Sequence, residues 1–331
     1  MKEDVIQSLL KEYGLGEMIA PVSKLSGGAL HTMLHVKTKQ KEYAIKGINP
    51  HIQEKKEFPG NYNVTEEIAT QFASNGLPAV TAMEFDGNYV LTRNNQSFLI
   101  YPYIEGSVLH HNQITVEHGK RVGELFAIMH NLNLHMTGCE GAEYLLFSNS
   151  HWQNLIDKVG FPDLKALENY ILSANDNYRG VIPSLENCSV LTHRDMHYKN
   201  MLWQDITPYI IDWESAGLMN PFMEVIGYAL EWSGILLEQT IDYELFSTIY
   251  SRYLSKQSLV NDGLVDVEKS FYGWLGHCVL GWTEFNLRRM LGQTSVDKEE
   301  IQRGHEIIET KMIPTLALLK SQERVIIERI Q

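Results

Sequence analysis

Apolar and polar residues alternate over much of the first hundred positions, whereas a helical period dominates from about residue 107 onward. Alternation with period two is typical of strands with one buried face, so we expect strands over 22–25, 30–36, 42–46, 80–83, 89–92 and 98–104. The helical spacing of apolar residues predicts helices over 1–18, 65–75, 115–131, 222–237 and 274–290, and one or two helices over 151–175. Strands are therefore expected to come first along the chain and helices to follow them.

The stretch over residues 190–214 combines short apolar runs with polar loops. A His-Arg-Asp triplet ends at Asp195, Asn200 follows five residues later, and Asp212 lies twelve residues beyond that. A turn over 205–208 between two apolar runs predicts a small hairpin between Asn200 and Asp212. In kinases this spacing provides an Asp that orients and deprotonates a hydroxyl, and two oxygen ligands for Mg²⁺. We assign Asp195 as the base and Asn200 and Asp212 as metal ligands; turn capping is the alternative for any one of them.

A second candidate site lies in the strand region. Ser26, Gly27 and Gly28 form a turn between two expected strands, and glycines there permit close approach of the backbone to phosphates. Lys46 ends a Tyr-Ala-Ile strand, which suits a residue that pairs with the α- and β-phosphates of a nucleotide. A plain hairpin and a solvated lysine are the alternatives.

A kinase-type lysine needs a helix glutamate as its partner, and the expected helix over 65–75 offers Glu66 and Glu67. We expect Glu66 to pair with Lys46; carboxylates that stabilise the helix N-terminus are the alternative. The segment from Tyr101 to Gly106 is an apolar strand interrupted by a proline, and it is suited to connect two lobes and to bind a purine. An ordinary edge strand is the alternative. The nucleotide-binding set is Ser26, Gly27, Gly28, Lys46, Glu66, Tyr101, Tyr103, Ile104 and Ile211.

Bulk properties exclude several classes of function. The 331 residues suffice for two lobes. The sequence contains no run of eighteen apolar residues, so we expect no membrane-spanning helix. A net charge of −13 argues against a nucleic-acid partner and is compatible with a cationic substrate. Three scattered cysteines predict reduced thiols, and the histidines lack zinc-site spacing. Without an export signal at the N-terminus, we expect a cytoplasmic protein, and the sequence does not indicate an oligomeric state.

Residues 193–217, from His-Arg-Asp-Met-His-Tyr-Lys-Asn to Ile-Asp-Trp-Glu-Ser-Ala-Gly, resemble the signature of the aminoglycoside phosphotransferase and choline kinase-like family. The Ser-Gly-Gly-Ala turn, the Ala-Ile-Lys strand and the Tyr-Pro-Tyr-Ile-Glu-Gly connector resemble its smaller lobe in order and spacing, so the resemblance covers about residues 20–230. It implies an α+β, two-lobed, protein-kinase-like fold, with a small antiparallel-sheet N-lobe over 1–104 and a larger, mainly helical C-lobe over 105–331. It implies the same roles for Asp195, Asn200, Asp212 and Lys46, and a purine site near Tyr103.

Two positions depart from the family pattern. Arg194 stands where that family usually has glycine, and Glu224 stands where an aspartate is usual. The chain also lacks the Gly-x-Gly-x-x-Gly loop and the Ala-Pro-Glu segment of protein kinases. We therefore expect a Mg²⁺-dependent phosphotransferase that uses ATP or GTP and a small-molecule hydroxyl acceptor, such as an aminoglycoside. The alternatives are a choline- or homoserine-type metabolite kinase, or a nucleotide-binding protein without turnover.

Overall fold

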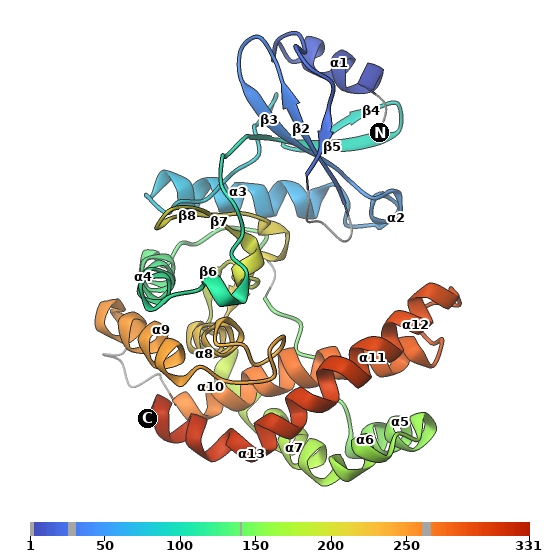
Figure 1. The fold of residues 1–331 in the computed structure, drawn as a ribbon, viewed down its shortest axis with the longest axis vertical. Helices are drawn as coiled ribbons and strands as arrows, with labels where there is room; N and C mark the ends of the chain where they lie inside the picture. The colour runs from blue at the N-terminus through green and yellow to red at the C-terminus, as the bar shows by residue number, and fades with distance from the viewer. Residues whose placement is uncertain (1–2, 26–30, 140, 260–265) are drawn as a thin grey trace. The chain divides into compact units, whose positions relative to one another are not determined.

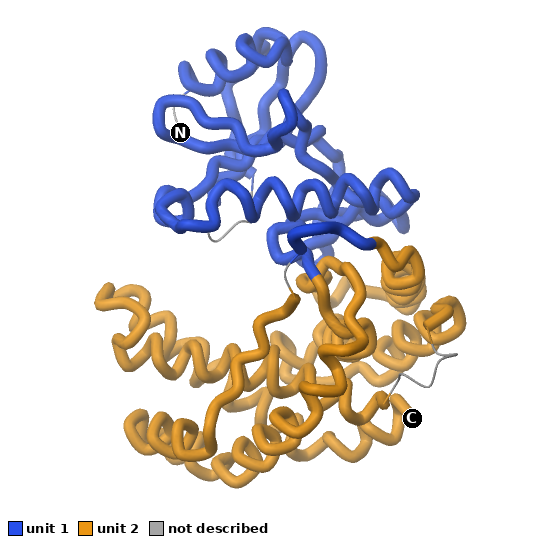
Figure 2. Tube along the Cα trace, turned by 180° about the vertical axis from the view of Figure 1, so that it is seen from behind, with its two compact units in different colours: residues 1–109, 135–139, 198–217 blue, residues 110–134, 140–197, 218–331 orange. Residues whose placement is uncertain are grey.

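The computed structural model describes residues 3–25, 31–139, 141–259 and 266–331. The chain forms two compact units, each built from separate segments of the sequence (Figure 2). Unit 1 consists of residues 1–109, 135–139 and 198–217, and unit 2 consists of residues 110–134, 140–197 and 218–331. The lobe boundary expected after residue 104 stays a prediction, because unit 1 takes segments from both sides of that position.

Unit 1 contains an antiparallel sheet of five strands in the order β1-β2-β3-β5-β4 (Figure 1). The strands are β1 (Ser23–Lys24), β2 (Thr32–Lys37), β3 (Glu42–Gly47), β4 (Leu91–Arg93) and β5 (Gln96–Pro102). The strand expected over 80–83 is absent from this described segment, so that expectation is wrong. Its backbone makes single bonds to other strands instead, because the Val80 N–H donates to the Ile210 carbonyl at 2.8 Å and the Met83 N–H donates to the Ile100 carbonyl at 2.7 Å.

The helices of unit 1 differ from their expected bounds for local reasons. Helix α1 (Glu3–Glu12) ends before residue 18 because the chain turns at Gly14, where φ is +66°. The short helix α2 (Pro50–Gln53) lies in a stretch expected to be flexible. Helix α3 (Gly60–Ser74) begins one turn earlier than residue 65. That first turn contains the buried Tyr62, whose packing outweighs the weak helix propensity around it.

The two faces of the sheet have different roles. Helix α1 packs on one face, against the side chains of Leu34, Tyr43, Ile45 and Ile100 among others. Successive residues of a strand point to opposite faces, so Lys46, the neighbour of Ile45, points away from α1. Its cross-strand partners are Met33 and Leu99, and Leu99 packs with Tyr62 of helix α3. Lys46 therefore lies on the sheet face that is covered by α3.

Residues 198–217 belong to unit 1 because they pack against helix α3 and the segment after it. They form η2 (Tyr198–Asn200), β7 (Met201–Gln204), β8 (Thr207–Ile210) and η3 (Trp213–Ser215), which confirms the expected hairpin. The Trp213 ring stacks on Phe72 of α3 at 5.5 Å, and the Ile210 N–H donates to the Pro78 carbonyl at 2.8 Å. The segment with both expected metal ligands is thus attached to the unit that contains Lys46.

Unit 2 is mainly helical, as the sequence predicts, and where one or two helices were expected over 151–175 the chain forms three, α5, α6 and α7. Its helices are α4 (Val116–Leu132), α5 (Asn149–Val159), α6 (Pro162–Ala166), α7 (Glu168–Leu185), α8 (Pro221–Trp232), α9 (Tyr243–Lys256), α10 (Val267–Trp274), α11 (Gly281–Met290), α12 (Lys298–Ile307) and α13 (Ile313–Ile330). The short elements are η1 (His111–Gln113), the π-helical η5 (Leu275–Leu280) and η6 (Ile308–Met312), and β6 (Val190–Thr192), which pairs with β9 (Gly217–Met219). No helix in the described residues is long and apolar enough to cross a membrane.

Helix α8 forms the centre of unit 2. Every residue of α8 except Glu231 is buried, and the helix packs against α4, α9 and α10 (Figure 1). Helices α4 and α9 approach closely at Gly123, where an added Cβ would lie 2.4 Å from the Ile249 carbonyl oxygen. A helix that is buried on almost every side is held firmly by its packing, so α8 gives rigid support to polar groups placed on it.

Candidate active site

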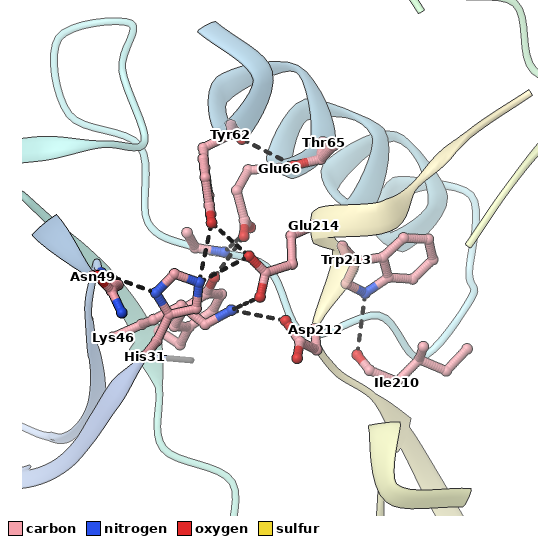
Figure 3. Close-up of polar contacts among 12 residues, drawn as sticks. His31, Lys46, Asn49, Tyr62, Thr65, Glu66, Ile210, Asp212, Trp213 and Glu214 are labelled. Atoms are coloured by element: carbon pink, nitrogen blue, oxygen red, sulfur yellow. Dashed lines mark hydrogen bonds and ion pairs between the residues drawn. The ribbon is translucent and has the colours of Figure 1, made fainter. Parts of the chain in front are cut away.

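The buried ammonium group of Lys46 is bonded to two carboxylates from the segment after β8 (Figure 3). Its Nζ donates to Asp212 Oδ1 at 2.7 Å and to Glu214 Oε1 at 3.0 Å. Burial lowers the pKa of Lys46, but the charges of Asp212 and Glu214 outweigh this and raise it to about 12. Lys46 is therefore a fixed positive charge on the sheet face under α3.

The other oxygen of Glu214 accepts hydrogen bonds from two further residues. Tyr62 Oη donates to Glu214 Oε2 at 2.6 Å, and His31 Nε2 lies 3.1 Å from the same oxygen. The Asn49 N–H donates to His31 Nδ1 at 3.1 Å, so Nε2 is the nitrogen with the proton and it donates to Glu214. Burial alone would raise the pKa of Glu214. The hydrogen bond from His31 and the charge of Lys46 instead move it well below its usual range.

The two expected metal ligands are brought together by the hairpin. The Asn200 carbonyl accepts from the Ile211 N–H at 3.0 Å, directly before Asp212. Asp212 has φ +65° and ψ +61°, a left-handed conformation that Asp tolerates better than most residues. Burial raises the pKa of Asp212, the charge of Lys46 opposes this rise, and the charge of Glu214 adds to it. The expected ligand Asn200 and the nucleotide-site residue Ile211 thus lie next to Asp212.

The expected ion pair between Glu66 and Lys46 is not formed, and this expectation is corrected by the structure. In the described residues the ion-pair partners of Lys46 are Asp212 and Glu214. Glu66 accepts instead from Tyr101 Oη at 2.5 Å and from the Ala82 N–H at 2.8 Å. Burial raises the pKa of Glu66. The hydrogen bonds from Tyr101 and Ala82 hold this carboxylate beside β5, where the charge of Lys46 lowers its pKa without an ion pair.

The residues expected to bind the purine lie at the end of β5. The Tyr103 ring stacks on the His35 ring of β2 with 3.8 Å between the ring centroids. The backbone N–H of Tyr103 donates to the Glu42 carbonyl at 3.1 Å. Ile104 follows directly after it, and Tyr101 is bonded to Glu66 on the α3 face. The expected phosphate turn of Ser26, Gly27 and Gly28 lies outside the described residues, although its C-terminal neighbour His31 contacts Glu214.

Asp195 lies in unit 2, in the loop after β6, and Glu224 of helix α8 is bonded to the start of that loop. Glu224 is 1% exposed, and its Oε1 accepts from the Arg194 N–H at 2.8 Å. Its Oε2 accepts from Thr192 Oγ1 at 2.5 Å and from His130 Nε2 at 2.7 Å. Glu224 therefore provides acceptors for the strand and the loop directly before Asp195.

Two further residues of helix α8 bind the loop on either side of Asp195. Tyr228 Oη donates to the Arg194 carbonyl at 2.6 Å, and Trp232 Nε1 donates to the Met196 carbonyl at 3.0 Å. Tyr228 and Trp232 follow Glu224 at four-residue intervals, so all three lie on one face of α8. Arg194 has φ +61°, a conformation that glycine adopts more easily. The buried face of α8 thus stabilises a strained backbone at the residue before Asp195.

Sequence reasoning missed several residues of these two clusters. Glu214 was visible as part of the Ile-Asp-Trp-Glu motif, but only its aspartate was assigned a role. The other missed residues, which have no local sequence signal, are His31, Tyr62, Tyr228 and Trp232. Their polar atoms meet partners from distant parts of the chain, which spacing along the sequence does not reveal.

A family model described as the phosphotransferase enzyme family matches residues 21–250. Similar solved structures include a spectinomycin phosphotransferase in complex with ADP and spectinomycin, with TM-score 0.71 and 14% identity over 96% of this chain and 98% of that one. A microcompartment-associated aminopropanol kinase has TM-score 0.65 and 14% identity over 100% of both chains. A Plasmodium vivax ethanolamine kinase has TM-score 0.60 and 15% identity over 95% of this chain and 86% of that one. No curated protein sequence matches the chain.

These similarities confirm the fold expected from the sequence. The chain has the protein-kinase-like fold, with a small antiparallel sheet in one unit and a mainly helical second unit. The residues covered by the family model include β3, the loop around Asp195 and the segment with Asp212 and Glu214. Both polar clusters described above therefore lie within the matched region.

Proposed function

Because the chain belongs to the phosphotransferase enzyme family, we propose that it transfers the γ-phosphoryl group of ATP or GTP to a hydroxyl group of a small molecule, with Mg²⁺ as cofactor. The observation that supports the nucleotide part best is the buried Lys46 ammonium, 2.7 Å from the Asp212 carboxylate. A fixed positive charge beside a carboxylate that can bind a metal ion is the arrangement that binds the phosphates of a nucleotide in kinases. Charge neutralisation and positioning are the main requirements of phosphoryl transfer.

The donor atoms near Asp212 fit a Mg²⁺ ion. A carboxylate and an amide oxygen, from Asp212 and Asn200, are hard ligands of the kind that Mg²⁺ prefers, and their backbones are joined through Ile211. When bound, Mg²⁺ would supply positive charge that neutralises the phosphates. Lys46 would bind phosphate oxygens directly. Tyr101, Tyr103, Ile104 and Ile211 are proposed to bind the purine, and Ser26, Gly27 and Gly28 the phosphates.

Asp195 is proposed as the group that orients the acceptor hydroxyl and takes its proton. This assignment is supported by the backbone around it, which is bonded on both sides to helix α8 through Tyr228 and Trp232. A carboxylate in a loop of restrained conformation presents its oxygens in one place, which general-base catalysis requires. Asp195 Oδ1 lies 3.7 Å from His197 Nε2, which is too far for a hydrogen bond.

The acceptor is proposed to carry a positive charge. The net charge of −13 favours cationic substrates over anionic ones through long-range attraction. The similar structures include a spectinomycin phosphotransferase and an ethanolamine kinase. An aminoglycoside-like compound and a small amino alcohol are therefore both candidates. The second of these candidates, the small amino alcohol, is supported by the similarity to an aminopropanol kinase over the full length of both chains.

A panel of acceptors with matched neutral controls tests this proposal. We expect ADP formation from Mg²⁺·ATP with spectinomycin, choline, ethanolamine or 1-amino-2-propanol, and a higher KM with ethylene glycol or propane-1,2-diol. The amine and its neutral counterpart differ only in the charged group, so the difference in KM reports recognition of charge. Equal KM values within a pair would contradict the cationic preference. ADP formation with none of the acceptors would reject the proposed acceptor class.

A further inference from the structure

We propose that Glu214, positioned by His31 and Tyr62, is the carboxylate that orients Lys46 toward the nucleotide phosphates, in place of the α3 glutamate Glu66. This inference rests on the proposed function, because it assigns a partner to the phosphate-binding lysine. A lysine with a flexible side chain binds phosphate well only when its ammonium group is fixed in one position. The contacts of Lys46 identify which carboxylate fixes it.

Each oxygen of Glu214 has a distinct role in the structure (Figure 3). Oε1 accepts from Lys46 Nζ at 3.0 Å, while Oε2 accepts from Tyr62 at 2.6 Å and from His31 at 3.1 Å. Tyr62 and His31 are both buried, at 4% and 7% exposed. Three donors from separate elements leave the carboxylate little rotational freedom, so Oε1 stays aimed at Lys46.

The donor to Glu214 is itself fixed by the backbone. The Asn49 N–H occupies His31 Nδ1 at 3.1 Å, which leaves the proton on Nε2 for Glu214. Asn49 follows shortly after Lys46, the residue on β3 that Glu214 contacts. One short stretch of chain therefore determines both the lysine position and the tautomer of the histidine that orients its partner.

Glu66 is held away from this role by two other contacts. One of its oxygens accepts from Tyr101 at 2.5 Å and the other from the Ala82 N–H at 2.8 Å. Glu66 is 3% exposed, so any freed donor would be left buried without a partner, which costs free energy. Glu66 therefore connects helix α3 to β5 and to the segment before β4, rather than to the lysine.

The two carboxylates beside Lys46, Asp212 and Glu214, differ in their other contacts. Asp212 accepts from Lys46 at 2.7 Å and shares a hydrogen bond with Glu214, and together with Asn200 it offers oxygen ligands of the kind that suit Mg²⁺. Glu214 in addition accepts from Tyr62 and His31, two buried donors that Asp212 does not contact. When Asp212 serves the metal, Glu214 remains as the negative charge that balances Lys46. The geometry thus assigns Asp212 to the metal and Glu214 to the lysine.

A matched pair of tyrosine variants tests this assignment. Tyr62→Phe removes the hydroxyl that donates to Glu214, whereas Tyr89→Phe removes a similarly buried hydroxyl that donates to Glu67 at 2.8 Å. We expect Tyr62→Phe to raise the Kd for ATP about tenfold, the scale of one hydrogen bond to a charged group, and Tyr89→Phe to leave it within about twofold. Binding is measured by calorimetry on the full chain, with thermal unfolding recorded in parallel.

Repeating the titration in EDTA separates the positioning role from metal binding. If Glu214 orients Lys46, Glu214→Gln weakens ATP binding by a similar factor with and without Mg²⁺, and by more than Glu66→Gln does. If Glu214 instead binds the metal, Glu214→Gln no longer weakens ATP binding in EDTA, and the assignment is overturned. His31→Asn, whose amide can accept from Asn49 and donate to Glu214, should restore most of the affinity that His31→Leu loses.

The outcomes also separate this inference from the proposed function. A wild-type chain that binds ATP while Tyr62→Phe binds it equally well overturns the role of Glu214 alone. The same holds if Glu66→Gln weakens ATP binding as much as Glu214→Gln. A wild-type chain that binds no ATP, with or without Mg²⁺, overturns the proposed function and this inference together.

Discussion

Replacing Asp195 with alanine is expected to lower kcat by about a thousandfold, within the range that a general base contributes. The variant loses the carboxylate that orients the hydroxyl and accepts its proton. The KM for ATP should change little, because Lys46 and Asp212, which are assigned to the nucleotide and metal, lie in unit 1. Steady-state kinetics with the best acceptor measure both quantities.

Two further variants make the Asp195 prediction specific. Asp195→Asn keeps the size of the side chain but not its basicity, so it should be almost as slow as alanine. Asp205→Asn is the control, because Asp205 is an exposed aspartate with φ +52° and asparagine tolerates that conformation. It should keep kcat within about twofold of the wild-type value, as surface changes normally do. An Asp195→Asn enzyme with the wild-type kcat would show that another group is the base.

Replacing Glu224 with alanine is expected to reduce the free energy of unfolding by about 3–5 kcal/mol, the range for removing one partner from a buried charged network. The change leaves the buried donors of Thr192 and His130 and the partly buried Arg194 N–H without their acceptor. It also creates a cavity beside helix α8, where packing is tight. Urea unfolding followed by far-ultraviolet circular dichroism measures the change.

Glu224→Gln and Glu238→Ala are the control variants for the unfolding measurement. Glutamine keeps the size and one acceptor oxygen, so its loss should be smaller than that of alanine. Glu238 is an exposed glutamate shortly after α8, and its replacement should change the free energy of unfolding by less than about 0.5 kcal/mol. If Glu224→Ala proved no more destabilising than Glu238→Ala, the proposed support of the Asp195 loop by α8 would be wrong.

Local patterns were sufficient to predict the elements with strong periodicity or turn signals. The hairpin around residues 205–208 and helix α4 after its Thr115 N-cap have such signals, and both formed as expected. The start of α3 and the segment over 80–83 were misjudged because their structure depends on tertiary contacts. Tyr62 packs into the core from the first turn of α3, and Val80 bonds to Ile210 from a distant hairpin.

The site was predictable only where a motif concentrates chemistry in a few consecutive residues. Asp195, Asn200 and Asp212 were assigned from such a motif, and their roles stay predictions. The network around Lys46 was not predictable, because His31 and Tyr62 lie 183 and 152 residues from Glu214 in sequence. The choice of Glu66 failed for the same reason, since its partners Tyr101 and Ala82 were not foreseeable from helix position alone.

The most direct test of the central claim is the transfer of ³²P from [γ-³²P]ATP to the acceptors of the panel, with Mg²⁺ and with EDTA. The proposed mechanism predicts a labelled phosphate ester of at least one hydroxyl acceptor in the presence of Mg²⁺ and no label in EDTA. ATP that binds with Mg²⁺ but leaves no label on any acceptor would contradict it, and would favour a nucleotide-binding protein without turnover.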